Sequence, residues 1–547
     1  MKINKVKKET FFQSILALML SQVFVKILGL FNKLYLTNKD DFGDEGNAIT
    51  SASFQVYSLL LSITSIGVPG AISKLVAERS SVGDHKGAYK IFKISLALFS
   101  IIGILGSYFL FYFSKMIANN ILGMPEIELS LIALSPSIFL VSAISVYKGY
   151  FNGRERLSIA AKAQTYDQLT KTFFTIFFIE IAIILSKVTG ISAIAACANL
   201  ATTAANVIEF GYLYLSYIKE LPNIKYEILT SINYREVRII RTIKEILFTA
   251  IPMSLSPLIG TIGKNIDSKT IITGLQHTMN YENAKIQYGI LNGKVDTLIN
   301  FPLSFSGTLS TALIPSIAAA KAKGKMSDVE NRINLSLLIG LLIAFPTVAI
   351  FAFQADNILK LLFPNASSGS TILMISSFSI IFIAIEQTIR GVLIGIGDNK
   401  IPLISITLAV GIKYILNKIL IPLSGFWGGI NGAAISNLIS HIVVTLFCYI
   451  CLKKEINIKI RKINILKAIA STTIFIIISK VIFNFLQLYI NSKISLILSL
   501  IIGILFYLFS IINFKILDIK QLKVVSFRQK KKENGKNITI WNYAKCL

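Results

Sequence analysis

Acidic residues, histidines and cysteines are scarce in this sequence. There are 28 Asp and Glu residues against 55 Lys and Arg, with three histidines and four cysteines. His85, His277 and His441 have no carboxylate or cysteine at metal-ligand spacing, so we predict no metal site. The sequence also lacks a Gly-rich phosphate loop of the ATPase type and any catalytic constellation, so we predict no cofactor and no enzymatic activity.

What the sequence does contain is apolar residues in long runs. Hydrophobic residues make up 54% of the chain, and the mean hydropathy of +0.67 is typical of a protein surrounded by membrane lipids. In a soluble protein the net charge of +27 would suggest nucleic acid. No basic stretch carries interleaved aromatics or a recognition motif, however, so we predict no nucleic-acid partner.

Fourteen apolar segments are long enough to cross a bilayer, which takes about 20 residues as a helix. They predict an all-α polytopic membrane protein with about 14 transmembrane helices. The segments are 11–37, 50–77, 91–113, 127–150, 158–186, 190–218, 239–275, 288–320, 333–353, 371–396, 401–423, 427–452, 464–490 and 493–516.

Basic residues gather in every second connection between these segments. Arg79, Lys86 and Lys90 lie in one such connection, whereas the first connection on the other side is acidic, with Asp40 and Asp44. Basic residues in short loops mark the cytoplasmic side of a membrane protein. The alternation predicts that the N- and C-termini are both cytoplasmic, and it supports an even number of helices.

Two pairs of similar motifs predict an internal duplication. The stretch 148–153 matches 390–395 as a basic residue followed by Gly-x-x-x-Gly, with Gly149 and Gly391 separated by 242 positions. The stretch 68–73 resembles 314–319 at an offset of 246 positions. Six helices separate equivalent points, so both halves would enter the membrane in the same direction, as parallel lobes.

The duplication predicts four parts of the chain. These are an N-terminal lobe (1–230, helices 1–6), a C-terminal lobe (231–456, helices 7–12), an appended pair of helices 13–14 (457–520) and a basic cytoplasmic tail (521–547).

Four lysines inside the apolar segments are candidate substrate-binding residues. A charge at mid-membrane costs about 2.5 to 3.5 kcal/mol on insertion scales, so such residues usually face a cavity or a partner. An ammonium cluster in a cavity favours a phosphate or pyrophosphate group, whereas a hydrophobic cation calls for acidic residues. Internal ion pairs and, for Lys33, a position at the membrane surface are the alternatives. The candidates are Lys26, Lys33, Lys264 and Lys294.

Two further groups of residues suggest coupling and motion. Lys413 and Asn417 share a helical face and, with Asp267, predict an ion-coupling site or its replacement by a fixed cation. Glycines and prolines interrupt three segments, where they would act as hinges or as static kinks. The hinge candidates are Gly67, Pro69, Pro252, Pro257, Pro302 and Pro315.

Six short motifs, in this order along the first twelve segments, resemble one known family. They are Lys26–Gly29 with Lys33–Tyr35, Gly43–Gly46, Gly67–Glu78, Lys148–Gly153, Tyr288–Gly293 and Leu313–Ile317. Together they are similar to the stage V sporulation protein B and MurJ-like branch of the multidrug, oligosaccharidyl-lipid and polysaccharide exporter superfamily.

The resemblance implies a multi-pass protein of the bacterial plasma membrane with two six-helix lobes and a final helix pair. It implies an alternating-access flippase that moves a polyprenyl-pyrophosphate-linked peptidoglycan or polysaccharide precursor from the inner to the outer leaflet. The family's cationic positions in helix one match Lys26 and Lys33 here. The second is commonly arginine in the family, so this chain lacks the bidentate guanidinium. The final helix pair would hold the lipid tail.

Two other functions remain open at this point. A drug or cation antiporter of the same superfamily would need an acidic cavity. A scaffold that transports nothing would instead bind cell-envelope synthesis or sporulation proteins.

Overall fold

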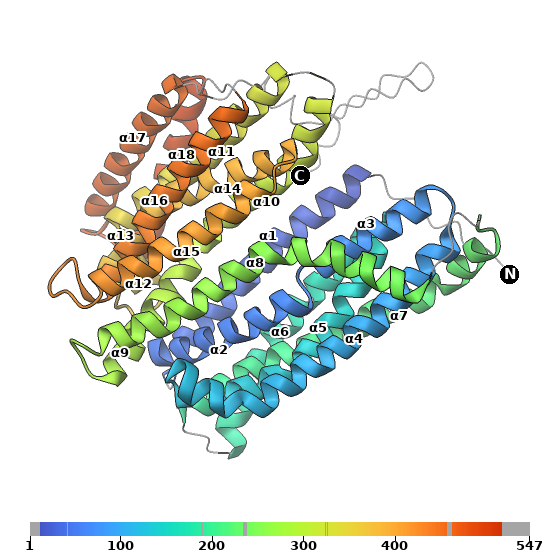
Figure 1. The fold of residues 1–547 in the computed structure, drawn as a ribbon. Helices are drawn as coiled ribbons and strands as arrows, with labels where there is room; N and C mark the ends of the chain where they lie inside the picture. Colours follow the sequence, from blue (N-terminus) through green and yellow to red (C-terminus); the bar gives the residue numbers. More distant parts are fainter. Residues whose placement is uncertain are drawn as a thin grey trace.

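The computed structural model describes residues 11–40, 42–186, 190–232, 238–322, 324, 326–456 and 462–516. The predicted basic tail, 521–547, lies outside the described residues. Figure 1 shows long helices lying side by side in two bundles, and the described residues form helices and turns.

The first bundle holds helices α1 to α7, which pack mainly on one another. Helices α2 and α3 are two parts of one predicted segment. A short π-helix, η1 (Ile117–Leu122), extends α4, and a 3₁₀ turn, η2 (Pro125–Ile127), precedes α5. The bounds are α1 (Phe11–Thr37), α2 (Gly43–Thr64), α3 (Val68–Ser81), α4 (His85–Met116), α5 (Glu128–Gly153), α6 (Leu157–Ser186) and α7 (Ile191–Leu229).

The second bundle holds helices α8 to α16, of which α8 also runs along α2, α3 and α4 of the first bundle, and the pair α17–α18 packs on its α11 side. A π-helix, η3 (Gly289–Val295), joins α9 to α10. The bounds are α8 (Ile239–Leu275), α9 (Tyr281–Tyr288), α10 (Asp296–Ala322), α11 (Met326–Phe353), α12 (Ala355–Leu362), α13 (Ser370–Ser377), α14 (Ser379–Ile396), α15 (Lys400–Leu420), α16 (Gly429–Glu455), α17 (Lys462–Leu486) and α18 (Ser492–Asn513).

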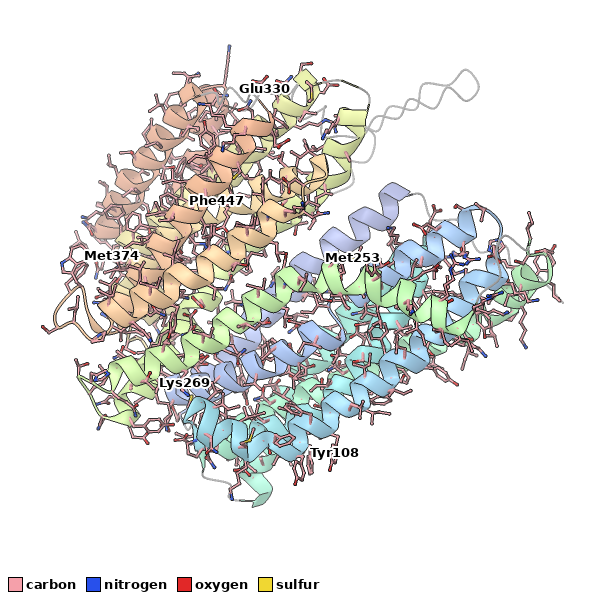
Figure 2. The ribbon with its side chains drawn as sticks, viewed as in Figure 1. Tyr108, Met253, Lys269, Glu330, Met374 and Phe447 are labelled. Atoms are coloured by element: carbon pink, nitrogen blue, oxygen red, sulfur yellow. The ribbon has the colours of Figure 1, made fainter. Side chains whose placement is uncertain are left out.

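These helices confirm the all-α polytopic fold. Within the described residues, twelve helices are long and apolar enough to cross a membrane. The other two predicted segments correspond to α1 and α6, helices of 27 and 30 residues. The outer surface is apolar, as a helix in contact with lipid requires. Tyr108, for example, points away from the bundle on α4 (Figure 2), and 63% of it is exposed. The four-part division of the chain stays a prediction.

Equivalent glycines of the two bundles make equivalent packing contacts. In α5, Gly153 lies against Ser73 and Val76 of α3, and in α14, Gly395 lies against α10 at Ile314 and Ile317. Small residues at such positions allow two helix backbones to approach closely. The contact residues Ser73 and Ile314 are 241 positions apart (314 − 73), which agrees with the spacing of the Gly-x-x-x-Gly motifs.

The second pair of similar motifs, 68–73 and 314–319, does not align in the structure as the glycine motifs do. Pro69 and Pro315 are separated by 246 positions, five more than the packing partners of the glycines. These prolines therefore do not occupy equivalent turns of α3 and α10. The duplication rests on the glycine motifs and the helix order, because close backbone packing constrains those positions more tightly than a proline does.

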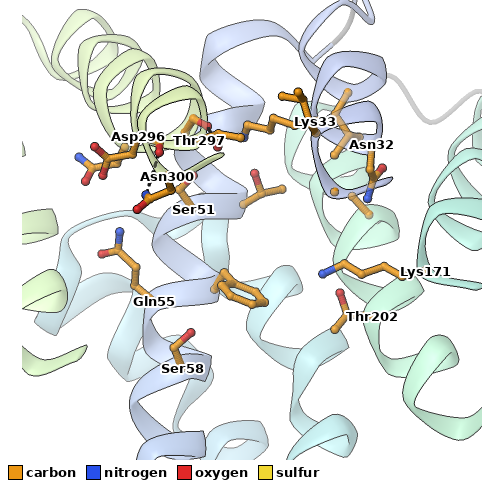
Figure 3. Close-up of a pocket in the computed structure, with 18 of the residues that line it drawn as sticks. Asn32, Lys33, Ser51, Gln55, Ser58, Lys171, Thr202, Asp296, Thr297 and Asn300 are labelled. Carbon is orange, nitrogen blue, oxygen red and sulfur yellow. Dashed lines mark hydrogen bonds between the residues drawn. The ribbon is translucent and has the colours of Figure 1, made fainter. Parts of the chain in front are cut away.

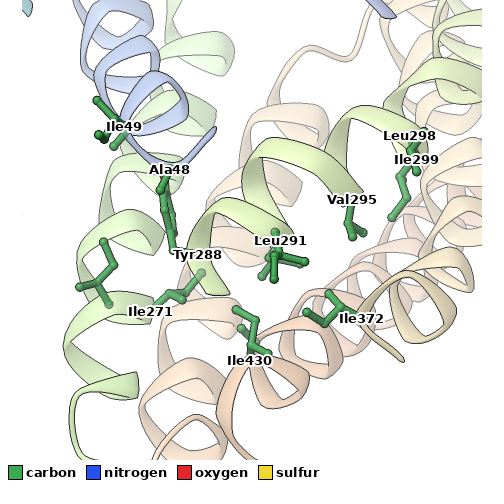
Figure 4. Close-up of a cluster of buried hydrophobic side chains, with 14 of the residues drawn as sticks. Ala48, Ile49, Ile271, Tyr288, Leu291, Val295, Leu298, Ile299, Ile372 and Ile430 are labelled. Atoms are coloured by element: carbon green, nitrogen blue, oxygen red, sulfur yellow. The ribbon is translucent and has the colours of Figure 1, made fainter. Parts of the chain in front are cut away.

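The bundles meet at one end, which we call the joined end. There α2 contacts α8, α9 and η3. Apart from α8, which continues along α3, the bundles diverge toward the ends of α3 and α10 (Figure 1). A single apolar cluster crosses this contact (Figure 4). It unites Ile49 of α2, Ile271 of α8, Leu291 of η3 and Ile372 of α13, all buried. Each such side chain contributes about 1.5 to 3 kcal/mol when it leaves water.

The predicted hinge residues lie where helices break or cross. Helix α2 ends at Thr64 and α3 begins at Val68, so Gly67 and Pro69 mark a real interruption. Gly67 lies directly against the α8 backbone at Ala250 and Ser254. Pro252 and Pro257 are inside α8, and Pro302 and Pro315 fall within α10. Their role in motion stays a prediction.

Replacing Gly391 with Ala should destabilise the fold, because the added Cβ would lie 2.8 Å from the backbone oxygen of Ser310. Overpacking of this kind costs about 1 to 3 kcal/mol. Gly211→Ala in α7 is the control, since nothing lies within 4 Å of that position and alanine favours helix by up to about 1 kcal/mol. Thermal unfolding in detergent measures both; equal melting temperatures would show that the glycine contact is not tight.

Candidate functional site

A cavity of about 510 Å³ lies between the two bundles. Its walls come from α1, α2, α6 and α7 on one side and from α8, η3 and α10 on the other (Figure 3). The joined end lies beside it, since Asn292 and Gly293 of η3 belong both to the wall and to the element that contacts α2. The cavity is therefore at the interface that must rearrange if the bundles move relative to one another.

Four lysines and one carboxylate give the cavity a positive charge. Lys26 and Lys33 come from α1, Lys171 from α6 and Lys264 from α8, and the single acidic residue in the wall is Asp296. Lys33 extends toward Thr297 of α10 in Figure 3. Within the described residues none of these lysines makes an ion pair. Their positive charges therefore act on one another, on Asp296 and on any ligand in the cavity.

Neutral polar side chains line the remainder of the wall. Ser51, Gln55 and Ser58 follow one face of α2, because their spacing matches successive turns of a helix. Thr202 of α7 and Asn300 of α10 face the same space (Figure 3). Hydroxyl and amide groups can both donate and accept hydrogen bonds, so this wall suits a ligand rich in hydroxyls beside an anionic group.

Three of the four lysines predicted to bind substrate line this cavity, and the fourth does not. Lys294 is completely buried, and its Nζ lies 2.8 Å from Asp44 Oδ1. An internal pair would join Lys294 to Asp296, two residues further along the same predicted segment. The structure instead pairs Lys294 across the bundles with a residue 250 positions earlier.

Lys171 is a cavity residue that the sequence reasoning missed. Its spacing from Asp167, one turn earlier, suggests an internal pair, but the described residues show no ion pair between them. The Lys171 ammonium instead lies 5.2 Å from the centre of the Phe54 ring, a cation–π distance. One signal could have identified it. Gln168 and Thr175 form a polar stripe with Lys171 on α6, at spacings of three and four residues, which indicates a polar face directed at a cavity.

The predicted coupling residues do come together. Lys413 Nζ lies 2.6 Å from Asp267 Oδ2, and Asn417 donates a hydrogen bond of 2.9 Å to Asp267 Oδ1. Both oxygens of this buried carboxylate are thus engaged by α15. The described residues contain no group of three His, Cys, Asp or Glu side chains arranged to hold a metal ion. Whether this trio couples transport to an ion stays a prediction.

Family comparisons match most of the chain. Residues 11–321 match the family model described as polysaccharide biosynthesis protein, and residues 294–419 match the MatE family model. The first match covers more than half of the chain and includes α1 to α10, hence every wall of the cavity.

Two curated relatives come from Bacillus subtilis (strain 168). Stage V sporulation protein B is 24% identical over 456 residues, covering 83% of this chain and 86% of the relative. Lipid II flippase MurJ is 22% identical over 435 residues, covering 76% and 77%.

Solved structures of one transporter superfamily share this fold. An inward-facing multidrug resistance MATE family transporter of the MOP superfamily matches with a TM-score of 0.65 at 16% identity, covering 81% of this chain and 98% of that one. The inward closed conformation of lipid II flippase MurJ matches with a TM-score of 0.64 at 17% identity, covering 90% and 97%. The chain is thus similar to membrane transporters and flippases and not to enzymes.

Replacing Lys413 with Met should destabilise the second bundle, because buried Asp267 would lose its ammonium partner. Breaking a buried pair in this way costs about 3 to 5 kcal/mol. Adding Asp267→Asn to the same chain removes the unpaired charge and should restore most of the loss. Thermal unfolding of the purified single and double variants measures this. A double variant no more stable than Lys413→Met would contradict the pairing.

Proposed function

Because this chain belongs to the polysaccharide biosynthesis protein family, we propose that it is a flippase for a polyprenyl-pyrophosphate-linked precursor of peptidoglycan or polysaccharide. The substrate would move from the inner to the outer leaflet of a bacterial plasma membrane. Membership in this family and the shared transporter fold support transport as the activity. The substrate class is our inference from the cavity.

The observation that carries the proposal is the set of unpaired lysines in the cavity. Lys26 and Lys264 are exposed and Lys33 and Lys171 are half-buried, and none of the four has a carboxylate partner within the described part of the chain. A cleft lined by charges of one sign attracts ligands of the opposite sign, here an anion. A pyrophosphate could bind several ammonium groups at once through charge-assisted hydrogen bonds. The hydroxyl and amide groups of α2, α7 and α10 would then bind the sugar.

Transport would follow from alternating access between the bundles. The head group would enter where the bundles diverge, bind Lys26 and the other cavity lysines, and leave after the joined end has separated. Pro257 lies in α8 between its contacts with α3 near Met253 and with α15 near Gly263, and Pro252 lies beside the first of these contacts. A bend at these prolines would let α8 follow both bundles.

The lipid part of the substrate would stay in the membrane during this movement. The pair α17–α18 packs on α11, where the Tyr507 hydroxyl donates a hydrogen bond of 2.8 Å to the Leu342 carbonyl. Much of the remaining surface of α17 and α18 is apolar and exposed, including Val481 and Leu505. We infer that this pair guides the polyprenyl tail. Enzymes of cell-envelope synthesis, which make and use the precursor, are the partners that this role implies.

A drug or cation antiporter is the second candidate, favoured by the MatE match over residues 294–419. Its cavity would need carboxylates to bind a cationic substrate. The cavity wall holds Asp296 against four lysines, which disfavours a cation. The charge balance therefore supports the flippase.

Lys26→Ala and Lys171→Ala should each weaken binding of farnesyl pyrophosphate about tenfold or more, because a hydrogen bond to a charged group contributes about 1.5 to 3 kcal/mol. Equilibrium binding to purified protein in nanodiscs measures this. Lys360→Ala is the control, since that lysine pairs with Asp356 on the exposed face of α12. Ethidium should not compete. Displacement by ethidium, with unchanged binding by both cavity variants, would favour the antiporter.

Cysteine labelling in cells tests the orientation that export requires. In a chain lacking its native cysteines, Gln276→Cys at the joined end should react with a membrane-impermeant maleimide in intact cells. Ser81→Cys, at the far end of α3, should react only after permeabilisation. Both positions are exposed. The reverse pattern would place the termini outside and contradict the proposed direction.

A further inference from the structure

A buried ion pair joins the two bundles at the joined end. Lys294 of η3 and Asp44 of α2 belong to different bundles, with Nζ at 2.8 Å from Oδ1 and 2.9 Å from Oδ2. The ammonium also donates to the Ala366 carbonyl at 2.6 Å, and the Ser368 hydroxyl donates to Asp44 Oδ2 at 3.0 Å. Both charged side chains are buried, with 0% and 8% of the side chain exposed.

Close backbone packing encloses this pair. A Cβ on Gly289 would lie 1.9 Å from the Asp44 carbonyl oxygen, and one on Gly293 would lie 2.7 Å from the Asn47 side chain. Two glycines one turn apart thus bring η3 directly onto α2. Water has little access to the pair while this contact holds, so neither charge can be solvated in place of its partner.

A neighbouring lysine shows what is unusual about Lys294. Lys285 of α9 pairs across the bundles with Glu45 and Glu126, each at 2.8 Å, and also with Glu282 of its own helix at 2.9 Å. When the bundles separate, Lys285 keeps Glu282. Lys294 keeps the Ala366 carbonyl, but within the described residues its one carboxylate partner is Asp44, which leaves with α2.

The pair also adjoins the cavity. Gly293 and Asp296, on either side of Lys294 in the chain, line the cavity wall. Lys33 lines the same wall. An anion bound in the cavity therefore lies next to the segment of η3 and α10 that carries Lys294.

We propose that Lys294 is a second anion-binding residue, masked by Asp44 while the joined end is closed and transferred to the substrate pyrophosphate when it opens. This inference rests on the proposed function, and it adds that opening of the joined end depends on bound substrate. Opening the empty protein would leave Lys294 without a counter-ion. Opening the loaded protein exchanges one anion for another, so the substrate itself favours opening.

Pulsed electron paramagnetic resonance can follow the opening directly. Spin labels at Leu129→Cys of α5 and Gln276→Cys after α8 would report the distance between the bundles at the joined end, in a chain without its native cysteines. Farnesyl pyrophosphate in nanodiscs is the probe. The spin-labelled protein with Lys294 and Lys285 intact should show one short distance without the probe. The probe should raise the fraction of molecules with a longer distance about tenfold.

Two substitutions separate masking from simple loosening. Lys294→Met should populate the longer distance without the probe, because Asp44 is left unpaired in the closed form, and the probe should then change the fraction less than twofold. Lys285→Met weakens the same interface, yet it should keep the full response to the probe. A Lys294→Met protein that opens only when the probe is added, as the protein with Lys294 intact does, would overturn the inference.

The binding measurement distinguishes this failure from a failure of the proposed function. Lys294→Met retains the four cavity lysines, so it should still bind farnesyl pyrophosphate in the closed form. Absence of binding even to the unmodified protein would reject the substrate class and the anion exchange together. Normal binding with an unaltered opening response in Lys294→Met would reject the exchange alone.

Discussion

The cost of holding an ammonium group away from water is the constraint on which the rest of this structure depends. Lys294 and Lys413 offset this cost by pairing with carboxylates of the chain itself, Asp44 and Asp267. Those pairs fasten helices together: the first joins the two bundles, and the second ties α8 to α15. The four cavity lysines are exposed or half-buried and lack such partners in the described structure, so they give the space between the bundles a positive charge.

Much of the fold could be predicted because hydropathy and small residues act locally. Each apolar run became one helix or, as in 50–77 and 371–396, two successive helices, and Gly153 and Gly395 make equivalent contacts in the two bundles. Lys26, Lys33 and Lys264 were identified as cavity residues for the same reason, since a charge inside an apolar helix must face something polar.

The rest depended on contacts between distant parts of the chain. Nothing near Lys294 in the sequence shows that Asp44 will reach it, so the sequence left its partner undetermined and its burial unseen. Lys171 was misjudged in the opposite direction, because a carboxylate one turn away looked like a partner and the polar stripe on α6 was overlooked. Pro69 and Pro315 proved not to be equivalent positions, because a proline kink tolerates displacement along a helix and a close glycine contact does not.

The charge of the proposed substrate would also couple its transport to the membrane potential. A membrane potential contributes about 2.3 kcal/mol per elementary charge per 100 mV, and one that is negative inside drives an anionic head group outward. Translocation of a fluorescent polyprenyl-pyrophosphate-linked sugar by protein reconstituted in vesicles tests this most directly. We predict movement between leaflets that accelerates when the potential is negative on the cytoplasmic side and that is lost in Lys26→Ala. Movement equal to that of protein-free vesicles, or export of cationic dyes instead, would contradict the account.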